Sequence, residues 1–243
     1  MKTYAAIWTT ISLLAAPAWS AGCEDVQFEE TSFTVCEADP ATDDIRLFLT
    51  TPDGEVLGSF NNVAASLPAG ELSWAVNAGM YHADRRPVGL YIEDGIERAP
   101  IVTRDGPGNF GLLPNGVLCL GEGRADIVES RRFAERAQSC QFATQSGPML
   151  VIEGALHPRF LPNSDSLNVR NGVGVTSAGQ LVVAISNERV NFHRFARFFR
   201  DALETPNALF LDGTISRLYA PDLDRHDAGF PMGPMLGVVT SGD

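Results

Sequence analysis

The sequence predicts an α+β fold of mixed, mostly antiparallel β-sheets with a few packed helices, in a single domain. Short apolar segments separated by Gly, Pro, Asn and Asp recur along most of the chain, as is typical of strands joined by turns. Only one segment, at residues 191–203, has a strong helical pattern of apolar residues. Strands and helices do not alternate regularly, which argues against a parallel βαβ sheet.

Residues 1–21 have the composition of a secretory signal peptide. Lys2 precedes an apolar segment at 11–19 that is too short to span a bilayer, and small residues lead to an expected cleavage site near Ala21 or Gly22. Residues 22–243 then form the mature domain, which is long enough to bury a core. We expect a periplasmic or secreted protein. A weak lipoprotein cleavage pattern before Cys23 leaves a lipid anchor as an alternative.

The four cysteines follow the expected cleavage site. An even number of cysteines in an exported chain favours disulfides. We expect Cys23–Cys36 and Cys119–Cys140, because each pair closes a short loop, although three connectivities are open. The sequence has no Cys-x-x-Cys motif or Cys/His cluster, so we predict no metal site and no cofactor.

The net charge is −12, which opposes nonspecific binding to nucleic acid and to anionic lipid. No segment after the signal peptide is long and apolar enough to span a membrane. An anionic substrate would need a local cationic pocket that works against the overall negative field.

The strand predictions follow the apolar segments and the turn residues that separate them. Strands are expected over 26–35, 45–49, 72–77, 87–92, 110–113, 117–120, 149–152, 180–185, 208–211 and 235–240. The glycines at 106–111 match a dinucleotide-binding pattern, but Pro114 prevents the helix that would have to follow. We therefore expect residues 110–120 to form a hairpin that turns at Asn115-Gly116.

Three segments of the sequence are candidates for helices. A short helix is expected at 61–67, and a surface helix or an irregular loop at 126–136. Asn191 can cap a longer helix that runs to about residue 203. Its apolar residues fall on one face and are expected to join the core: Phe192, Phe195, Phe199, Ala202 and Leu203.

Asp212 and Gly213 directly follow the apolar run at 208–211. An unbroken apolar run is typical of a strand buried on both faces, and a carboxylate at its end is partly desolvated, so its pKa can be tuned for reaction. Gly213 allows close approach of a ligand. The alternative is a hairpin turn, because Asp-Gly between apolar segments is also a typical turn sequence.

Other polar residues stand beside glycines at the ends of predicted strands. Asn77 suits either a sugar hydroxyl or a turn, and His82 suits acid–base catalysis, a structural role or a place on the surface. Arg170 precedes a glycine-rich strand, where its guanidinium suits a phosphate or carboxylate, or a structural ion pair. Ser146 lacks the flanking glycines of a serine hydrolase.

Seven short motifs occur in a characteristic order. They lie at 77–81, 87–90, 109–110, 114–117, 145–150, 170–174 and 211–216. Together they resemble the phosphodiester glycosidase family, which includes N-acetylglucosamine-1-phosphodiester α-N-acetylglucosaminidase. The family often has Asn-Gly-Gly-Phe-Phe at 77–81, where this chain has Asn-Ala-Gly-Met-Tyr, and Asp-Gly-Gly-Gly-Ser at 212–216, where it has Asp-Gly-Thr-Ile-Ser.

The resemblance implies hydrolysis of a sugar-1-phosphodiester, either small or part of the cell envelope, at the glycosidic carbon–oxygen bond. Such a reaction needs a carboxylate near the cationic anomeric carbon and donors on the departing phosphate. The roles we expect are Asp212 as nucleophile or base, Arg170 and Ser216 on phosphate, Asn77 and Gln145 on the sugar, and His82 or Glu153 as proton donor. The motifs add Gly79, Asn109, Ser146, Gly147 and Gly213 as substrate-binding positions.

Two other functions fit the same residues. A phosphodiesterase would break the phosphorus–oxygen bond instead of the glycosidic bond. A noncatalytic module could bind envelope glycans, with Asp212 serving only as a turn residue.

Overall fold

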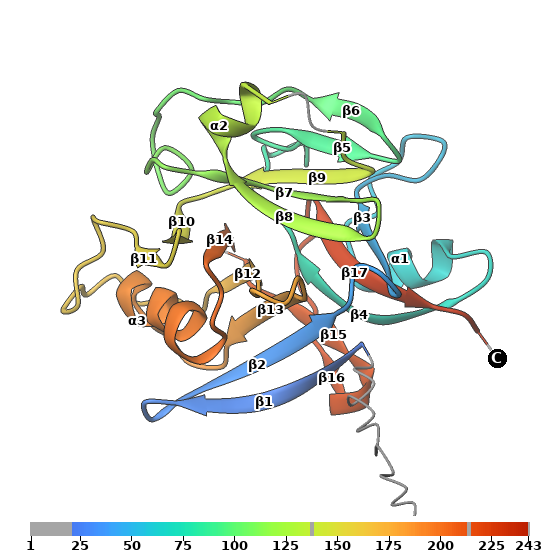
Figure 1. The fold of residues 1–243 in the computed structure, drawn as a ribbon. Coiled ribbons are helices and arrows are strands. Elements are labelled where there is room, and N and C mark those ends of the chain that lie inside the picture. Colours follow the sequence, from blue (N-terminus) through green and yellow to red (C-terminus); the bar gives the residue numbers. More distant parts are fainter. Residues whose placement is uncertain (1–20, 137–138, 213–214, 243) are drawn as a thin grey trace, which may run out of the picture.

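Three antiparallel β-sheets and a few short helices make up the fold (Figure 1). The computed structural model describes residues 21–136, 139–212 and 215–242. The expected signal peptide, apart from Ala21, therefore lies outside the described residues, and so does Gly213. The mostly antiparallel α+β fold expected from the sequence is confirmed.

The largest sheet has seven strands. In spatial order they are β1 (Gly22–Phe28), β2 (Thr31–Ala38), β13 (Leu181–Ser186), β12 (Asn171–Val175), β14 (Asn207–Asp212), β10 (Met149–Ile152) and β11 (Ala155–Leu156). The β12–β14 register shifts after the Asn171–Asp212 pair, and this irregularity lies at the end of β14.

The other two sheets have five strands each. The β4 sheet contains, in order, β16 (Arg225–His226), β15 (Leu218–Ala220), β4 (Glu71–Asn77), β17 (Met235–Thr240) and β3 (Asp44–Phe48). The β9 sheet contains β6 (Ile96–Ala99), β5 (Tyr91–Glu93), β9 (Phe142–Ser146), β7 (Gly116–Gly121) and β8 (Arg124–Glu129).

The described helices are all short. They are α1 (Phe60–Ser66), α2 (Ser130–Ala134), α3 (Phe192–Arg197), the π-helical turn η1 (Phe198–Ala202) that continues α3, and the 3-10 turn η2 (Pro221–Leu223). Asn191 caps α3 as expected, since its side chain accepts a hydrogen bond from the Arg194 backbone N–H. Of the residues expected on the apolar face, Phe195 and Phe199 are buried and Phe192 and Leu203 are partly buried, whereas Ala202 is exposed. Phe198 is buried as well.

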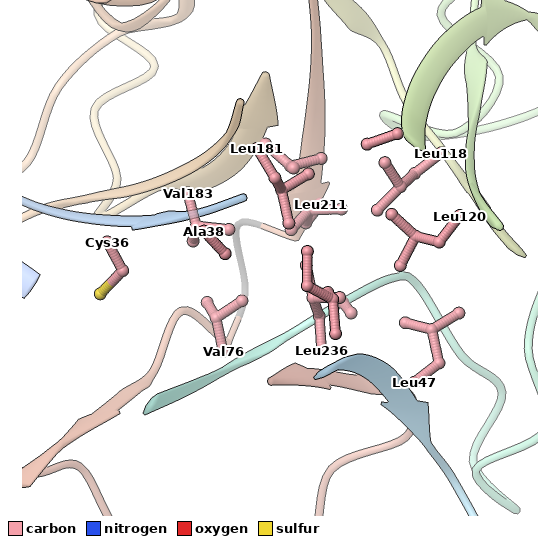
Figure 2. Close-up of a cluster of buried hydrophobic side chains, with 14 of the residues drawn as sticks. Cys36, Ala38, Leu47, Val76, Leu118, Leu120, Leu181, Val183, Leu211 and Leu236 are labelled. Carbon is pink, nitrogen blue, oxygen red and sulfur yellow. The ribbon is translucent and has the colours of Figure 1, made fainter. Parts of the chain in front are cut away.

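One hydrophobic cluster joins all three sheets. Figure 2 shows Leu181 and Leu211 of the seven-stranded sheet pointing toward Leu236 of the β4 sheet and Leu118 of the β9 sheet. Each of these side chains is fully buried. Since no sheet closes its own core, the three sheets stabilise one another.

The seven-stranded sheet is also covered on its other face, by α3 and η1. Along β14, Leu209 and Leu211 belong to the cluster between the sheets, whereas Ala208 and Phe210 pack with the phenylalanines of α3 and η1. Successive strand residues point to opposite faces, so a strand covered on both sides must be apolar throughout. This explains the unbroken apolar run at 208–211.

Both expected disulfides are present. Cys23–Cys36 links β1 to β2, and Cys119–Cys140 links β7 to the segment before β9. The second disulfide lies in a small cluster with Val117 and Phe133. Both bonds therefore tie a strand to its immediate surroundings.

Several sequence-based boundaries differ from the structure. Residues 26–35 form two strands that turn at Glu29-Glu30, both with positive φ. The hairpin expected at 110–120 is wrong: 110–113 are turns, and β7 pairs with β8. Residues 124–129, which include part of the expected surface helix, form strand β8 before the one-turn helix α2. Of 87–92, only the last two residues are in a strand, namely β5.

Among the helices of residues 21–136, 139–212 and 215–242, none has the length and apolar character needed to cross a membrane.

His157 is a buried histidine whose protonation affects folding. Its Nε2 lies 3.1 Å from the Leu113 carbonyl oxygen, and its Nδ1 accepts a hydrogen bond from the Arg159 backbone N–H at 3.3 Å. Both nitrogens of the buried ring are therefore hydrogen-bonded when the ring is neutral. Burial lowers the pKa of His157 below its ordinary value of 6.5, and the Arg159 charge acts in the same direction against the opposing effect of the Leu113 carbonyl.

A lowered pKa in the folded state means that the unfolded chain binds more protons as the pH falls through about 6.5. We therefore predict that the free energy of unfolding decreases from pH 7.5 to pH 5, and that His157→Gln reduces this slope. Denaturant unfolding at several pH values tests this, with the exposed His226→Gln as control. Identical slopes in the parent and His157→Gln would contradict the prediction.

Candidate active site

The ends of strands from different sheets meet at Asp212. Asp212 is the last residue of β14, and Asn171 is the first residue of β12, directly opposite it in the antiparallel pair. Asn77 is the last residue of β4. Asn77 and Asn171 are fully buried, and Asp212 is 9% exposed. The site is thus built where the seven-stranded sheet adjoins the β4 sheet.

Asn171 connects the two sheets with its side-chain amide. Its Nδ2 donates to the Asn77 backbone oxygen at 2.7 Å and to Asn77 Oδ1 at 3.1 Å. Its Oδ1 accepts from the Asp212 backbone N–H at 3.1 Å. Because an asparagine amide both donates and accepts, one buried side chain fixes the main chain at Asp212 relative to β4.

Asn77 holds the segment that follows Asp212. Its Oδ1 accepts from the Arg217 backbone N–H at 2.8 Å, and its Nδ2 donates to the Ile215 carbonyl. The Ser216 hydroxyl lies 3.0 Å from the Asp212 carbonyl oxygen and 3.1 Å from that of Val169. Asn77 and Ser216 therefore position the backbone around Asp212, where we had expected direct substrate contacts.

The β9 sheet also contacts this region. The Ser146 hydroxyl donates to the Leu211 carbonyl oxygen at 2.8 Å, and the Thr144 hydroxyl donates to the Ala78 carbonyl oxygen at 2.8 Å. Both donors are buried. All three sheets thus contribute to the position of Asp212.

Asp212 lines a cavity of about 830 Å³. The other described residues that line it are Met80, Tyr81, His82, Ala83, Arg85, Val88, Pro107, Gly108, Asn109, Phe110, Ile215, Phe230 and Pro231. The cavity therefore brings together three of the predicted site residues, namely Asp212, His82 and Asn109. It is large enough for a sugar with a substituent.

Tyr81 lies within the electrostatic reach of Asp212. Burial raises the pKa of the Tyr81 hydroxyl above its ordinary value, and the negative charge of Asp212 raises it further, while Arg85 and Arg217 oppose the shift. The Arg85 guanidinium carbon is 5.3 Å from the centroid of the Tyr81 ring. An acid, a phenol and the cation Arg85 therefore line this cavity, and the charge of Arg217 acts on Tyr81.

Arg170 does not line this cavity, contrary to our expectation. It is 1% exposed, and its guanidinium donates to the backbone oxygens of Val190 and Ser166, each at 2.9 Å. The guanidinium carbon also lies 3.7 Å from the centroid of the Phe192 ring. Burial lowers the pKa of Arg170 to about 10. We therefore assign Arg170 a structural role at the start of β12 and no contact with phosphate.

Glu153 and Gln145 also lie outside the residues that line the cavity. Glu153 is exposed in the turn between β10 and β11, where it pairs with Arg132. Gln145 is buried, and its Oε1 accepts from the backbone N–H groups of Leu90 and Val102 at 3.0 and 2.9 Å. Gln145 therefore ties neighbouring segments to β9.

Gly79 and Gly147 are required by close packing. Gly79 has a φ of +155°, and a Cβ there would lie 2.9 Å from the Thr144 hydroxyl oxygen. A Cβ at Gly147 would lie 2.4 Å from the Asn115 Cβ. Neither glycine lines the cavity. Both instead allow the close packing of segments next to the site.

The strand pairing excludes a hairpin turn at Asp212. β14 belongs to the seven-stranded sheet and β15 to the β4 sheet, so the chain crosses between sheets after Asp212. Asp212 therefore does not turn a hairpin between β14 and the next strand.

Sequence reasoning missed Asn171, Tyr81, Arg85 and Phe230. Asn171 and Tyr81 lie in motifs that we had singled out for other residues. Arg85 stands in a stretch of charged residues with no distinctive spacing, and Phe230 in a loop whose course depends on distant contacts.

Known proteins resemble this chain in sequence and in fold. The phosphodiester glycosidase family model matches residues 70–239. The uncharacterized protein YigE of Escherichia coli is 32% identical over 212 residues, which are 86% of this chain and 83% of YigE.

One similar solved structure is the catalytic domain of zebrafish N-acetylglucosamine-1-phosphodiester α-N-acetylglucosaminidase, auto-inhibited by its pro-peptide. Its TM-score is 0.62 at 13% identity, and the match covers 90% of this chain and 82% of that one. A hypothetical protein from Synechocystis has a TM-score of 0.57 at 12% identity, and the match covers 90% and 61% of the two chains. These two structures share the fold.

We predict that Asn171→Ala destabilises the protein by about 1–3 kcal/mol, because it removes the buried hydrogen bonds that the Asn171 side chain makes with the Asn77 carbonyl and the Asp212 N–H. Urea unfolding monitored by circular dichroism measures this effect. The exposed Asn163→Ala is the matched control and should change stability by less than about 0.5 kcal/mol. Equal stabilities of the two variants would argue against a connecting role for Asn171.

Proposed function

The chain belongs to the phosphodiester glycosidase family, and on this basis we propose that it hydrolyses the glycosidic carbon–oxygen bond of a sugar-1-phosphodiester. The products are a free sugar and a phosphomonoester. The observation that carries the proposal is the position of Asp212, which is nearly buried at the end of β14 and lines an 830 Å³ cavity.

Asp212 is the group we assign to the anomeric carbon. As the bond to phosphate breaks, positive charge develops on the sugar ring, and a carboxylate beside C1 stabilises it or attacks it. Asp212 acts either as this nucleophile or as the base that activates water. The bonds from Asn171 and Asn77 fix the main chain on both sides of it.

Arg85 takes the place that we had given to Arg170. It lines the Asp212 cavity, and its charge acts on Tyr81 there. A guanidinium suits an anionic phosphate because it offers charge-assisted hydrogen bonds. Arg85 thus supplies a local positive charge within a chain whose net charge is −12. His82 also lines the cavity and is the remaining candidate for a proton donor.

A second cavity of about 930 Å³ adjoins the first and shares His82 and Val88 with it. It is lined by residues of both five-stranded sheets, including Phe48, Glu93 and Arg98. We assign this space to the group esterified on the far side of the phosphate. The mixed polar and apolar lining suits a small polar group or a fragment of the cell envelope.

We also propose that the protein is exported through a signal peptide at residues 1–21. The two disulfides support an oxidising compartment such as the periplasm or the cell exterior.

Asp212→Asn is the direct test of catalysis. We predict a loss of at least about 10³-fold in kcat with little change in the melting temperature, because the amide keeps the shape but cannot stabilise a cation or attack. The assay measures free sugar released from sugar-1-phosphodiesters. Full activity in Asp212→Asn, or no activity of the parent on any such substrate, would favour the glycan-binding module.

Hydrolysis in heavy-oxygen water identifies the bond that breaks. Glycosidic cleavage places the label on the sugar, and mass spectrometry of both products shows it. Label in the phosphate would instead identify a phosphodiesterase.

Phe230 is the aromatic side chain that we expect to pack against the sugar. It is 80% exposed although it lines the cavity, and Arg217 Nη1 donates to its backbone oxygen at 2.6 Å. Burying a phenylalanine side chain is worth about 1.5–3 kcal/mol, so we predict that Phe230→Ala raises KM by about tenfold or more.

The exposed Leu161→Ala is the control for Phe230→Ala, since Leu161 does not line the cavity. Phe230→Trp should keep KM close to that of the parent. An unchanged KM in Phe230→Ala would exclude Phe230 from the sugar site.

A further inference from the structure

The hydroxyl group of Tyr81 is a buried polar atom on a residue that lines the cavity. Within the described part of the chain, Tyr81 Oη has no hydrogen-bond partner. Tyr81 lines the same cavity as Asp212. A buried hydroxyl without a partner costs free energy, and such groups in native proteins call for an explanation. A ligand oxygen that takes the place of the atoms now covering the hydroxyl would supply a partner.

The ring of Tyr81 is held in position by its neighbours. A Cβ at Gly233 would come within 2.6 Å of the ring, so the ring packs directly on the glycine backbone. The Arg85 guanidinium carbon is 5.3 Å from the ring centroid, within the range of a cation–π contact. These contacts restrict the ring and therefore the position of its hydroxyl oxygen. A donor group held in a fixed position is what electrostatic catalysis requires.

The charges around the hydroxyl keep it protonated. Burial and the negative charge of Asp212 raise the pKa of Tyr81, while Arg85 and Arg217 lower it by less than the total rise. Tyr81 is therefore a neutral hydrogen-bond donor near a carboxylate and a cation. This combination suits an anionic oxygen placed between the hydroxyl and Arg85.

Resting on the function proposed above, we propose that Tyr81 Oη donates a hydrogen bond to the phosphate oxygen that leaves the anomeric carbon. When the C1–O bond breaks, its electron pair moves to this oxygen, and the hydrogen bond strengthens as negative charge develops there. The proton stays on Tyr81, because a phosphate ester is already a stable anion.

Tyr81→Phe removes only the hydroxyl and is the decisive variant. We expect kcat to fall about 10²-fold, the scale found when one donor to a developing oxyanion is removed. The melting temperature should stay constant or rise, because no hydrogen bond within the described chain is lost. Tyr219→Phe is the matched control: Tyr219 packs against Phe60 outside this cavity, and its variant should keep parental activity.

A kcat of Tyr81→Phe within twofold of the parent, or a rise in KM alone, would overturn the assignment. A second measurement separates this failure from failure of the proposed function. If the parent hydrolyses no sugar-1-phosphodiester, thermal shifts with glucose 1-phosphate decide. A stabilisation of the parent that is reduced in Tyr81→Phe and kept in Tyr219→Phe supports the donor; equal shifts in all three proteins, or none, overturn it.

Discussion

The side-chain amides of Asn77 and Asn171 form the contact on which the rest of the site depends. They lie at the ends of strands from two sheets, both are fully buried, and their hydrogen bonds run to each other and to the main chain on either side of Asp212. Buried polar groups of this kind are stable only when their bonding capacity is used. The same bonds that join the sheets therefore fix the residue that we place at the reaction centre.

Arg170 supports this junction from inside the core. It directly precedes Asn171, and its guanidinium bonds to two backbone oxygens and packs on Phe192 of α3. A buried cation held by carbonyls and an aromatic ring anchors the start of β12 to the helix side of the sheet. Arg170, which we expected on the phosphate, thus positions the strand that pairs with β14, and the arginine that lines the cavity is Arg85.

Sequence patterns predicted those elements whose structure depends mainly on residues within the same segment. The run at 208–211 and the capped helix after Asn191 follow from burial on both faces and from a single amide cap, both of which are visible in the sequence. The hairpin at 110–120 failed because its turn residue, Asn115, is buried and donates to the Phe110 carbonyl at 3.0 Å, while β7 pairs with later strands.

Of the site residues predicted from the sequence, Asp212, His82 and Asn109 line the cavity. The site was not predictable at Tyr81 and Phe230, because their roles depend on Gly233 and Arg217, which come from segments far away in the chain. The direction of a side chain such as Arg170 is also set by partners outside its own strand. A motif therefore identifies a region of the site more reliably than the atoms that act in it.

A crystal structure with a bound sugar-1-phosphate would show directly whether Asp212 faces the anomeric carbon. We expect C1 of the sugar beside the Asp212 carboxylate, with the phosphate directed toward Tyr81 and Arg85. A ligand seated elsewhere, or a phosphate directed away from both of these side chains, would contradict this expectation.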